Sequence, residues 1–456
     1  MFERYRIIHF VGIGGIGMSG IAEVLRNLGY EVTGSDLRES ATTERLRRIG
    51  VKVYIGHDPN NVDSAHVVVT SSAVKDDNPE VIEARRRSIP VIPRAEMLAE
   101  LGRLKYSVLI AGSHGKTTTT SLVGHILAHT GMDPTVVIGG ILKSTGSNAR
   151  LGQGEFLVAE ADESDGSFLK LSPTIALATN IDREHMDYFK DMETLAGAFR
   201  SFLEKVPFYG ASIVCNDDPI LREMGGSLRR PSLSYGLTGD ADITAVEVRP
   251  EEGGVSFLLY IDGEPLGRFL IPLIGRHNVL NTLGAIGVAR ELRIDMEDVR
   301  IALQEFPGIQ RRFEFKGERM GVRVYDDYGH HPTEIKALLS AVRENLSGRI
   351  VVIFQPHRYT RTRDLFYEFL EAFDEADLLY LMDIYPAGES PIPGVSTSNL
   401  NDALHERGIN SVYISDRETL VESVTGGLRE GDILITLGAG DVWKIGEEIV
   451  GSNGDK

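Results

Sequence analysis

The sequence contains very little cysteine. Cys215 is the only cysteine in 456 residues, and no Cys-x-x-Cys pair exists. An internal disulfide and a cysteine-based zinc or redox site are therefore excluded, and a reducing compartment fits this composition. Long apolar runs are also absent, because glycines interrupt the N-terminal apolar stretch and no other run approaches the length of a membrane span. We expect a cytoplasmic protein without membrane insertion.

Positive charge is in deficit as well. Lys and Arg number 48 against 66 for Asp and Glu, which leaves a net charge of −18. Such a chain repels nucleic acid and anionic membranes at long range, so we expect neither as a partner. Any small anionic ligand must be held by local donors against that field.

The remaining composition is that of a globular protein with several domains. Hydrophobic residues make up 42% and charged residues 25%, and the length exceeds what one core usually serves. Apolar runs alternate with helical patterns along the chain, which is typical of an α/β fold with parallel sheets. Segments rich in Pro and Gly separate three predicted α/β domains, at residues 1–104, 105–309 and 310–456.

The strongest local signal is a glycine-rich loop between an apolar strand and an amphipathic helix. It consists of Gly112, Ser113, His114, Gly115, Lys116, Thr117 and Thr118. Backbone N–H groups of such a loop bind phosphate oxygens, the lysine neutralises the β- and γ-phosphates, and the threonine hydroxyl reaches Mg²⁺. Ile110 stands where the longer motif has its first glycine, so this is a shortened form. The alternative is an ordinary strand–helix turn, which rarely carries Gly-Lys-Thr in this context.

A second glycine turn directly follows the first predicted strand. Its glycines are Gly12, Gly14, Gly15 and Gly17, and Asp36 stands at the end of the second strand. This pattern is typical of a dinucleotide-binding fold, although the same turn can hold any nucleoside diphosphate. The phosphate loop elsewhere in the chain favours two separate nucleotide-type ligands. A turn needed only for helix–sheet packing is the structural alternative.

Acidic residues gather downstream of the phosphate loop. Glu160, Asp162, Glu163 and Asp165 follow an apolar strand, and hard carboxylate oxygens there suit Mg²⁺; a solvated loop is the alternative. His185 follows another strand and has acidic neighbours. A lone histidine is more often structural, but ligands of open α/β sheets bind at strand ends. The pair His330-His331 lacks further ligands at usable spacing, so we expect a turn there.

Taken in order, these motifs resemble those of the ATP-dependent Mur ligases over essentially the whole chain. The segments that carry the resemblance are 112–118, 160–165, 179–180 with 185–187, 275–281, 311–314 and 327–332. The first glycine turn and segments 70–73 and 93–97 are similar to the member that uses UDP-N-acetylmuramate and L-alanine. The resemblance implies an N-terminal Rossmann-like domain for the UDP-sugar, a central P-loop domain for ATP and a C-terminal Rossmann-like domain for the amino acid.

The same resemblance implies roles for individual residues. Lys116 would hold the β- and γ-phosphates, Thr117 and Glu160 would hold Mg²⁺, for which Mn²⁺ can substitute, and His185 would bind or position a second metal. Beyond the phosphate loop, the residues implied to bind ATP are His277, Asn278, Asn281, Arg312 and Asp327. Those implied to bind the UDP-sugar are Gly12, Gly14, Gly15, Gly17, Asp36, Ser71, Ser72 and Arg94.

In the third domain, His357, Arg358 and Arg361 resemble the region that receives the amino acid and the developing acyl phosphate. Two arginines on one loop suit a carboxylate or phosphate clamp, and a solvated basic face is the alternative. The reaction implied is amide formation, in which ATP activates the lactyl carboxylate of UDP-N-acetylmuramate and L-alanine then attacks.

Two alternatives stay open on the sequence alone. A recycling ligase that attaches a preformed tripeptide to the same UDP-sugar shares several motifs, although segment 163–166 and the compact third domain favour the alanine enzyme. A NAD-dependent oxidoreductase would explain the first glycine turn but leaves the Gly-Lys-Thr loop unexplained. The oligomeric state, monomer or homodimer, is not indicated.

Overall fold

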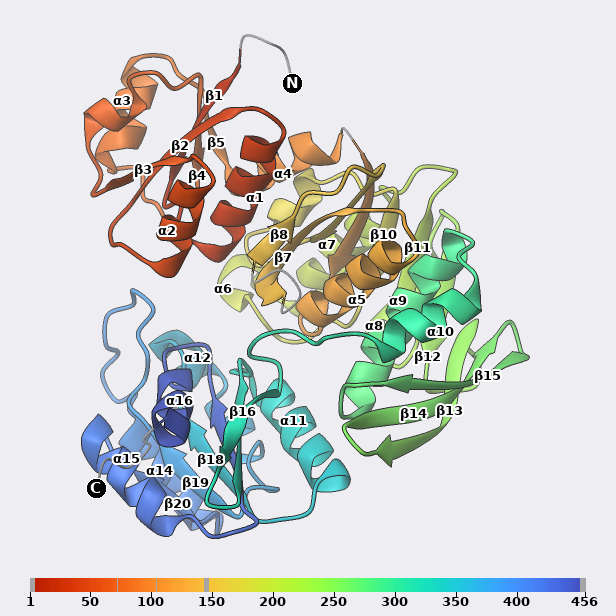
Figure 1. Ribbon diagram of the computed structural model, residues 1–456, viewed down its shortest axis with the longest axis vertical. Coiled ribbons are helices and arrows are strands. Elements are labelled where there is room, and N and C mark those ends of the chain that lie inside the picture. The colour runs from red at the N-terminus through yellow and green to blue at the C-terminus, as the bar shows by residue number, and fades with distance from the viewer. Residues whose placement is uncertain (1–4, 72, 104, 143–146, 452–456) are drawn as a thin grey trace. The chain divides into compact units, whose positions relative to one another are not determined.

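The computed structural model describes residues 5–71, 73–103, 105–142 and 147–451, and these form sheets of five, ten and six strands (Figure 1). The chain divides into two compact units. The N-terminal unit comprises residues 1–248, 256–272 and 278–307, and the C-terminal unit comprises residues 249–255, 273–277 and 308–456. Within the described ranges no helix has both the length and the apolar character needed to cross a membrane.

The first sheet of the N-terminal unit is parallel, in the order β3-β2-β1-β4-β5. Its strands are β1 (Ile7–Val11), β2 (Glu31–Asp36), β3 (Lys52–Ile55), β4 (Val67–Thr70) and β5 (Val91–Pro93). The accompanying helices are α1 (Ile16–Asn27), α2 (Ala41–Arg48), η1 (Pro59–Val62), α3 (Pro79–Arg86) and α4 (Arg94–Gly102). The strand order reverses between β1 and β4, and open sheets of this kind bind ligands at such a switch point.

The second sheet has the order β15-β14-β13-β12-β11-β10-β6-β9-β7-β8. Its strands are β6 (Tyr106–Ala111), β7 (Thr135–Leu142), β8 (Ser147–Arg150), β9 (Phe156–Glu160), β10 (Ile175–Ala178), β11 (Ala211–Cys215), β12 (Ser232–Gly236), β13 (Ile243–Glu251), β14 (Gly254–Ile261) and β15 (Glu264–Ile271). Its helices are α5 (Lys116–His129), η2 (Ser167–Lys170), α6 (Met186–Phe189), α7 (Met192–Leu203), α8 (Pro219–Gly225), α9 (Arg276–Glu291) and α10 (Met296–Gln304). Strands β9, β6, β10 and β11 run parallel, so their carboxyl ends lie at one edge.

The C-terminal unit is built on a third sheet, in the order β16-β17-β21-β18-β19-β20. Its strands are β16 (Glu314–Arg319), β17 (Val322–Asp327), β18 (Ile350–Phe354), β19 (Leu378–Leu381), β20 (Ser411–Tyr413) and β21 (Ile433–Leu437). Its helices are α11 (Pro332–Asn345), α12 (Tyr359–Asp364), α13 (Phe366–Leu370), α14 (Thr397–Glu406), α15 (Arg417–Gly427) and α16 (Trp443–Gly451). Only the β16–β17 pair is antiparallel among the pairings described for this sheet.

Both faces of the third sheet are buried because successive side chains of β18 point in opposite directions. Ile350, Val352 and Phe354 belong to a core cluster with residues of α11, α13 and α14, whereas Val351 and Ile353 pack with residues of α15 and α16. This explains why β18 is a continuous apolar run and not an alternating one.

The predicted α/β fold with parallel sheets is confirmed. Strands β13, β14 and β15 follow residue 242, with Asp262 and Gly263 at positive φ between β14 and β15. The β16–β17 hairpin was not predicted, because β16 is a charged edge strand and β17, which pairs with β16 and β21, is not a continuous apolar run. The predicted domain boundaries stay a prediction.

Candidate active site

The phosphate loop connects β6 to α5, and two of its glycines adopt backbone conformations that favour glycine. Gly112 has φ +140° and Gly115 has φ +80°. A Cβ atom at Gly112 would collide with the Thr179 side chain, and one at Gly115 would collide with the Asn281 carboxamide. Both glycines are therefore required by conformation and by space.

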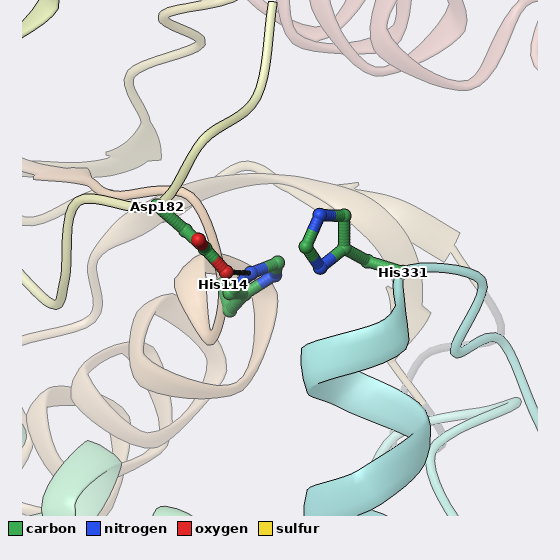
Figure 2. A group of neighbouring side chains, drawn as sticks. All are labelled: His114, Asp182 and His331. Carbon is green, nitrogen blue, oxygen red and sulfur yellow. Dashed lines mark hydrogen bonds and ion pairs between the residues drawn. The ribbon is translucent and has the colours of Figure 1, made fainter. Parts of the chain in front are cut away.

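The segment after β10 holds the phosphate loop in place. Asn180 Oδ1 accepts a hydrogen bond of 2.8 Å from the His114 N–H, and Thr179 Oγ1 donates one of 2.6 Å to the His114 carbonyl. The Asp182 N–H donates to Ser113 Oγ over 2.8 Å. The His114 ring also pairs with Asp182, Nε2 to Oδ2, over 2.9 Å (Figure 2). The loop is thus fixed before any ligand binds.

The N-terminus of α5 is open to an anion. Gly115 is the N-cap and makes no side-chain capping bond, so the first-turn amides of Lys116, Thr117 and Thr118 keep their donors for another partner. The helix dipole adds partial positive charge at the same point. Asn281 of α9 lies against this turn, since its Oδ1 accepts from Thr119 Oγ1 over 3.3 Å. Its Nδ2 donates to Asn278 Oδ1 over 3.1 Å, so the second predicted asparagine contacts the first.

Lys116 is paired with a buried carboxylate. Its Nζ donates to Glu163 Oε1 over 2.8 Å and to the carbonyls of Gly112 and Ser113. Burial raises the pKa of Glu163 to about 7, against the opposing effect of Lys116. Burial alone would lower the pKa of Lys116, but Glu163 and Asp162 raise it above its ordinary value, so the lysine stays charged. An ammonium is therefore held at the phosphate loop.

The acidic segment after β9 divides its carboxylates among different partners. Asp162 Oδ2 lies 3.0 Å from Arg94 Nη2, and although burial opposes ionisation, Lys116 and Arg94 hold the pKa of Asp162 at about 2. Asp165 Oδ1 accepts from the Ser167 N–H over 2.9 Å, which makes it a turn residue. Glu163 pairs with Lys116. The four carboxylates thus have different partners, and the magnesium site expected at this segment stays a prediction.

Glu160 stands at the end of β9, beside Ile110 of β6. Its Oε1 accepts from the Gly139 N–H over 2.6 Å. A second set of hard donors lies nearby in the chain, because ligand atoms of Glu163, Glu184 and His185 all lie within 4.8 Å of one another. His185 Nε2 is 4.0 Å from Glu163 Oε1. Oxygen and imidazole donors of this kind suit a divalent cation.

The first glycine turn is bound to the end of β2. Gly12 and Ile13 donate their N–H groups to the Ser35 carbonyl over 2.8 and 3.0 Å, and Gly14 donates to Asp36 Oδ2 over 2.8 Å. Ser71 lies beside the turn, 3.4 Å from the position of a Cβ on Gly12. A Cβ on Gly17 would collide with the Arg94 guanidinium. The predicted UDP-sugar residues therefore gather at one end of the sheet, whereas Ser72 lies outside the described residues.

The C-terminal unit brings together three further predicted residues. Asp327 accepts N–H groups from Phe313 and Gly329, each over 2.7 Å, and burial raises the pKa of Asp327 to about 6 against the effect of Arg312. Burial, reinforced by Arg312, lowers the pKa of His277 to about 4. His277, Arg312 and Asp327 are therefore electrostatically coupled, with a neutral imidazole beside the guanidinium.

The residues after β18 form a second cluster in this unit. Arg361 Nη1 lies 3.3 Å from His357 Nδ1, and the His357 ring stacks on Tyr385 at 5.6 Å. Arg358 has φ +70° and donates its N–H to the Tyr385 carbonyl over 2.8 Å. Burial, with His330, Arg361 and Arg358 nearby, lowers the pKa of His357 to about 3. His357 is thus neutral at ordinary pH and the two arginines carry the charge of this cluster.

His331 has the turn role expected from the sequence. It is the N-cap of α11, where its Nδ1 accepts from the Thr333 N–H over 3.3 Å, and Figure 2 shows it at the start of that helix. Glu334 Oε2 accepts in return from the N–H groups of His330 and His331. This reciprocal pattern is a capping box.

Sequence reasoning missed the residues that support the site. The role of Asp182 and Asn180 in holding the phosphate loop depends on contacts across 66 to 69 positions, and a local motif does not contain that information. The sequence places Glu163 in an acidic segment that suits Mg²⁺, whereas its burial and its pairing with Lys116 are visible only in the structure. In the sequence, the only indication that segment 179–182 supports the phosphate loop was its position at the end of a predicted strand.

Known proteins are similar to this chain over nearly its whole length. Profiles of the Mur ligase family match it in three parts: the catalytic domain at residues 7–106, the middle domain at 110–289 and the glutamate ligase domain at 311–440. The UDP-N-acetylmuramate--L-alanine ligase of Geotalea daltonii is 55% identical over 451 residues, which cover 99% of this chain and 98% of that protein.

Solved structures agree with these sequence matches. The UDP-N-acetylmuramate-alanine ligase of Thermotoga maritima superposes with a TM-score of 0.84 at 29% identity, over 97% of this chain and 98% of that one. A murein peptide ligase of Psychrobacter arcticus has a TM-score of 0.72 at 22% identity, with 99% of each chain covered, and that likeness shows the fold alone.

Proposed function

The chain belongs to the Mur ligase family, and from that premise we propose that it joins L-alanine to the lactyl carboxylate of UDP-N-acetylmuramate at the expense of ATP. The reaction is a step of peptidoglycan precursor synthesis and forms ADP and phosphate. The 55% identity to a ligase of that name over nearly the full chain is the observation that carries the substrate assignment. A hydride-transfer function is set aside, because the first glycine turn is accounted for by a UDP-sugar.

The phosphate loop is proposed to bind the β- and γ-phosphates of ATP. The open first-turn amides of α5 and the Lys116 ammonium supply hydrogen bonds and positive charge to these anions. When ATP binds, Lys116 must give up part of its interaction with Glu163 in order to contact the phosphates. Glu163 can take up a proton at little cost during that exchange, because its pKa is already about 7. ATP binding is thus expected to change the charge of Glu163.

The donors present fit Mg²⁺, because the chain supplies carboxylate and hydroxyl oxygens, with one imidazole nitrogen, near the strand-end edge of the second sheet. Glu160, whose carboxylate reaches only one backbone N–H among its described contacts, and the hydroxyl of Thr117 would hold one ion. His185, with Glu163 and Glu184 nearby, would hold or position a second. Bound Mg²⁺ neutralises charge on the phosphates of ATP.

The first chemical step is proposed to form an acyl phosphate. An oxygen of the lactyl carboxylate attacks the γ-phosphorus of ATP, the bond from that phosphorus to the bridging oxygen of ADP breaks, and ADP departs with the electron pair. Lys116 and the loop amides stabilise charge on the transferring group. The Gly12–Gly17 turn, Asp36 and Arg94 position the UDP-sugar, and the ion pair of Arg94 with Asp162 links that site to the charges around Lys116.

The second step is proposed to form the amide. The neutral amine of L-alanine attacks the acyl carbon, the bond to phosphate breaks, and the amine gives up a proton to solvent. Arg358 and Arg361 are proposed to bind the carboxylate of L-alanine or the acyl phosphate, and His277, Arg312 and Asp327 are proposed to bind ATP. No side chain acts as a nucleophile, so catalysis consists of positioning and electrostatic stabilisation.

A phosphate-release assay tests the proposal. Purified enzyme is mixed with ATP, Mg²⁺ and UDP-N-acetylmuramate, and L-alanine, glycine, L-serine or the stem tripeptide is added separately. We expect release to depend on the UDP-sugar and to be fastest with L-alanine, and mass spectrometry should show the UDP-N-acetylmuramoyl-L-alanine product. A preference for the tripeptide would replace the proposal with the recycling ligase, and release without any amide product would refute both.

A further inference from the structure

A fully buried carboxylate lies beneath the first glycine turn and has no part in the mechanism above. Glu80 is on α3, which Asn78 caps and Pro79 begins, and its side chain is 0% exposed. It accepts hydrogen bonds from Ser35 Oγ over 2.5 Å and from Asn61 Nδ2 over 2.6 Å. A buried charge persists only where such partners satisfy it.

Two imidazoles face the same carboxylate. His57 Nδ1 lies 3.3 Å from Glu80 Oε2 and 2.9 Å from Ser35 Oγ. His9, which is also 0% exposed, places Nε2 at 3.6 Å from Glu80 Oε2 while its Nδ1 contacts Thr33 Oγ1 at 2.8 Å. Although burial opposes ionisation, interactions with His9, Ser35 and Asn61 hold the pKa of Glu80 below its ordinary value, so the group is an anion.

The network connects to the glycine turn through Ser35. The carbonyl of Ser35 accepts the N–H groups of Gly12 and Ile13, while its hydroxyl is held by Glu80. The next residue, Asp36, accepts from Gly14 through its carboxylate and from Gly56 through its carbonyl. Glu80 thus fixes the residue to which two of the turn's amides are bound.

The same carboxylate also fixes the segment after β3. Asn61 Nδ2 donates to Glu80 Oε1, and the Asp58 N–H approaches that oxygen at 3.4 Å. The end of β2 and the start of this segment are joined by the Gly56–Asp36 hydrogen bond. Of the two supports of the glycine turn, Ser35 therefore contacts Glu80 directly, and Asp36 is connected to it through Gly56 and Asn61.

We propose that Glu80 is a positioning residue for the UDP part of the substrate: through Ser35 it holds the Gly12–Gly17 turn in the conformation that binds a diphosphate. The inference rests on the proposed function only in naming UDP as the ligand. A preorganised set of backbone donors binds an anion more tightly than the same donors on a loose turn, because the loose turn loses conformational freedom on binding. Nothing in this role requires Glu80 to touch the ligand.

Substitution of Glu80 changes the interactions of the charged and titratable groups around it. His9 and His57 face it directly, Asp58 presents its backbone, and beyond His9 lie Tyr54, with ring centroids 6.3 Å apart, and Lys52 above the Tyr54 ring. Glu80→Gln keeps the size of the side chain and removes the charge. Ser35 and Asn61 donate to different oxygens of Glu80, and the carboxamide has an acceptor oxygen at only one of these two positions, so the network loses at least one bond.

The test is calorimetric titration of the full-length protein with UDP. We expect Glu80→Gln to raise the Kd for UDP on the order of tenfold, the factor that a lost hydrogen bond to a charged group supports. In steady-state assays the KM for UDP-N-acetylmuramate should rise by a similar factor, with kcat and the KM for ATP unchanged. Glu83→Gln is the matched control, because Glu83 lies one turn further along α3 and pairs with Arg86 and Arg87 at the surface.

Ser35→Ala is a second variant, and it tests the Glu80–Ser35 contact even if Glu80→Gln does not fold. It should raise the Kd for UDP similarly, and the double variant should be no worse than either single one, since both act on one route. Unchanged UDP affinity in the folded variants, or fully additive effects, would overturn the inference. A wild-type protein that binds UDP but forms no amide would refute the proposed function. The comparison of UDP affinity between the wild type and the Glu80 and Ser35 variants would still test the role of Glu80.

Discussion

Replacement of Lys116 by methionine removes one positive charge from the phosphate loop while keeping the length of the side chain. In the structure the ammonium contacts Glu163 Oε1 at 2.8 Å and two loop carbonyls. The substitution therefore has two effects. It deprives the transferring phosphoryl group of a cation, and it leaves Glu163, whose side chain is 1% exposed, without its partner.

The sizes of the two effects differ. Removing one preorganised electrostatic contact to a transition state lowers kcat by about 10²- to 10³-fold, or about 3 to 4 kcal/mol. An unpaired buried carboxylate would cost a further 3 to 5 kcal/mol of folding free energy, roughly. Glu163 avoids most of that cost by taking up a proton, because its pKa is already about 7 in the presence of Lys116 and rises when the ammonium is gone. We therefore expect a folded protein with very little activity.

The assay measures kcat for phosphate release and the Kd for ADP by calorimetry, with the urea midpoint as a check on folding. Lys105→Met is the matched control, because Lys105 also donates to backbone carbonyls, those of Gly152 and Gly154, but before β6 and away from the loop. Its kcat should stay within about twofold of the wild type. A Lys116→Met variant that keeps more than about a tenth of kcat, or a control that loses activity to the same degree, would refute this role of Lys116.

Three further predictions concern other parts of the two units. Gly112→Ala should abolish ADP binding, because the new Cβ collides with Thr179. The control Gly131→Ala, at φ +77° with open space around it, should cost only about 1 kcal/mol of stability and keep ADP binding. Equal ADP affinity in the two variants would contradict the steric role of Gly112. Arg94→Ala should raise the KM for the UDP-sugar and, by removing the partner of Asp162, also the KM for ATP; Arg103→Ala, which breaks a surface pair with Glu100, should change neither. Burial raises the pKa of Asp327 from 3.8 to about 6, so the folded state binds the proton of this carboxyl more tightly than the unfolded chain does. The unfolding free energy should therefore fall by up to about 3 kcal/mol as the pH rises from 4 to 6. Asp327→Asn should flatten that part of the urea-midpoint profile, and an unchanged slope would show that the group does not titrate there.

The phosphate loop and the glycine turn could be predicted from the sequence because their chemistry is local. Gly112 and Gly115 need φ values that favour glycine, and the strand and helix on either side are apolar and amphipathic over whole elements. The α/β fold followed for the same reason, since buried parallel strands such as β18 are continuous apolar runs. The β16–β17 hairpin did not follow, because neither the charged edge strand β16 nor the alternating strand β17 is a continuous apolar run.

The supports of the site could not be predicted because they depend on contacts between distant segments. The sequence places Glu163 among acidic neighbours and says nothing of its pairing with Lys116, 47 positions away. Glu80 and Ser35, 45 positions apart, look like surface residues of a helix and a strand until burial is known. For His331 the sequence predicted a turn, and the structure shows more specifically that this residue caps the N-terminus of α11.

The central claim is that ATP activates the lactyl carboxylate and that L-alanine then displaces phosphate from it. UDP-N-acetylmuramate carrying oxygen-18 in that carboxylate, incubated with the enzyme, ATP and unlabelled L-alanine, tests both halves in one measurement by mass spectrometry. The account predicts equal amounts of UDP-N-acetylmuramoyl-L-alanine and phosphate, with one labelled oxygen in each phosphate. Unlabelled phosphate, or phosphate formed without the amide, would contradict it.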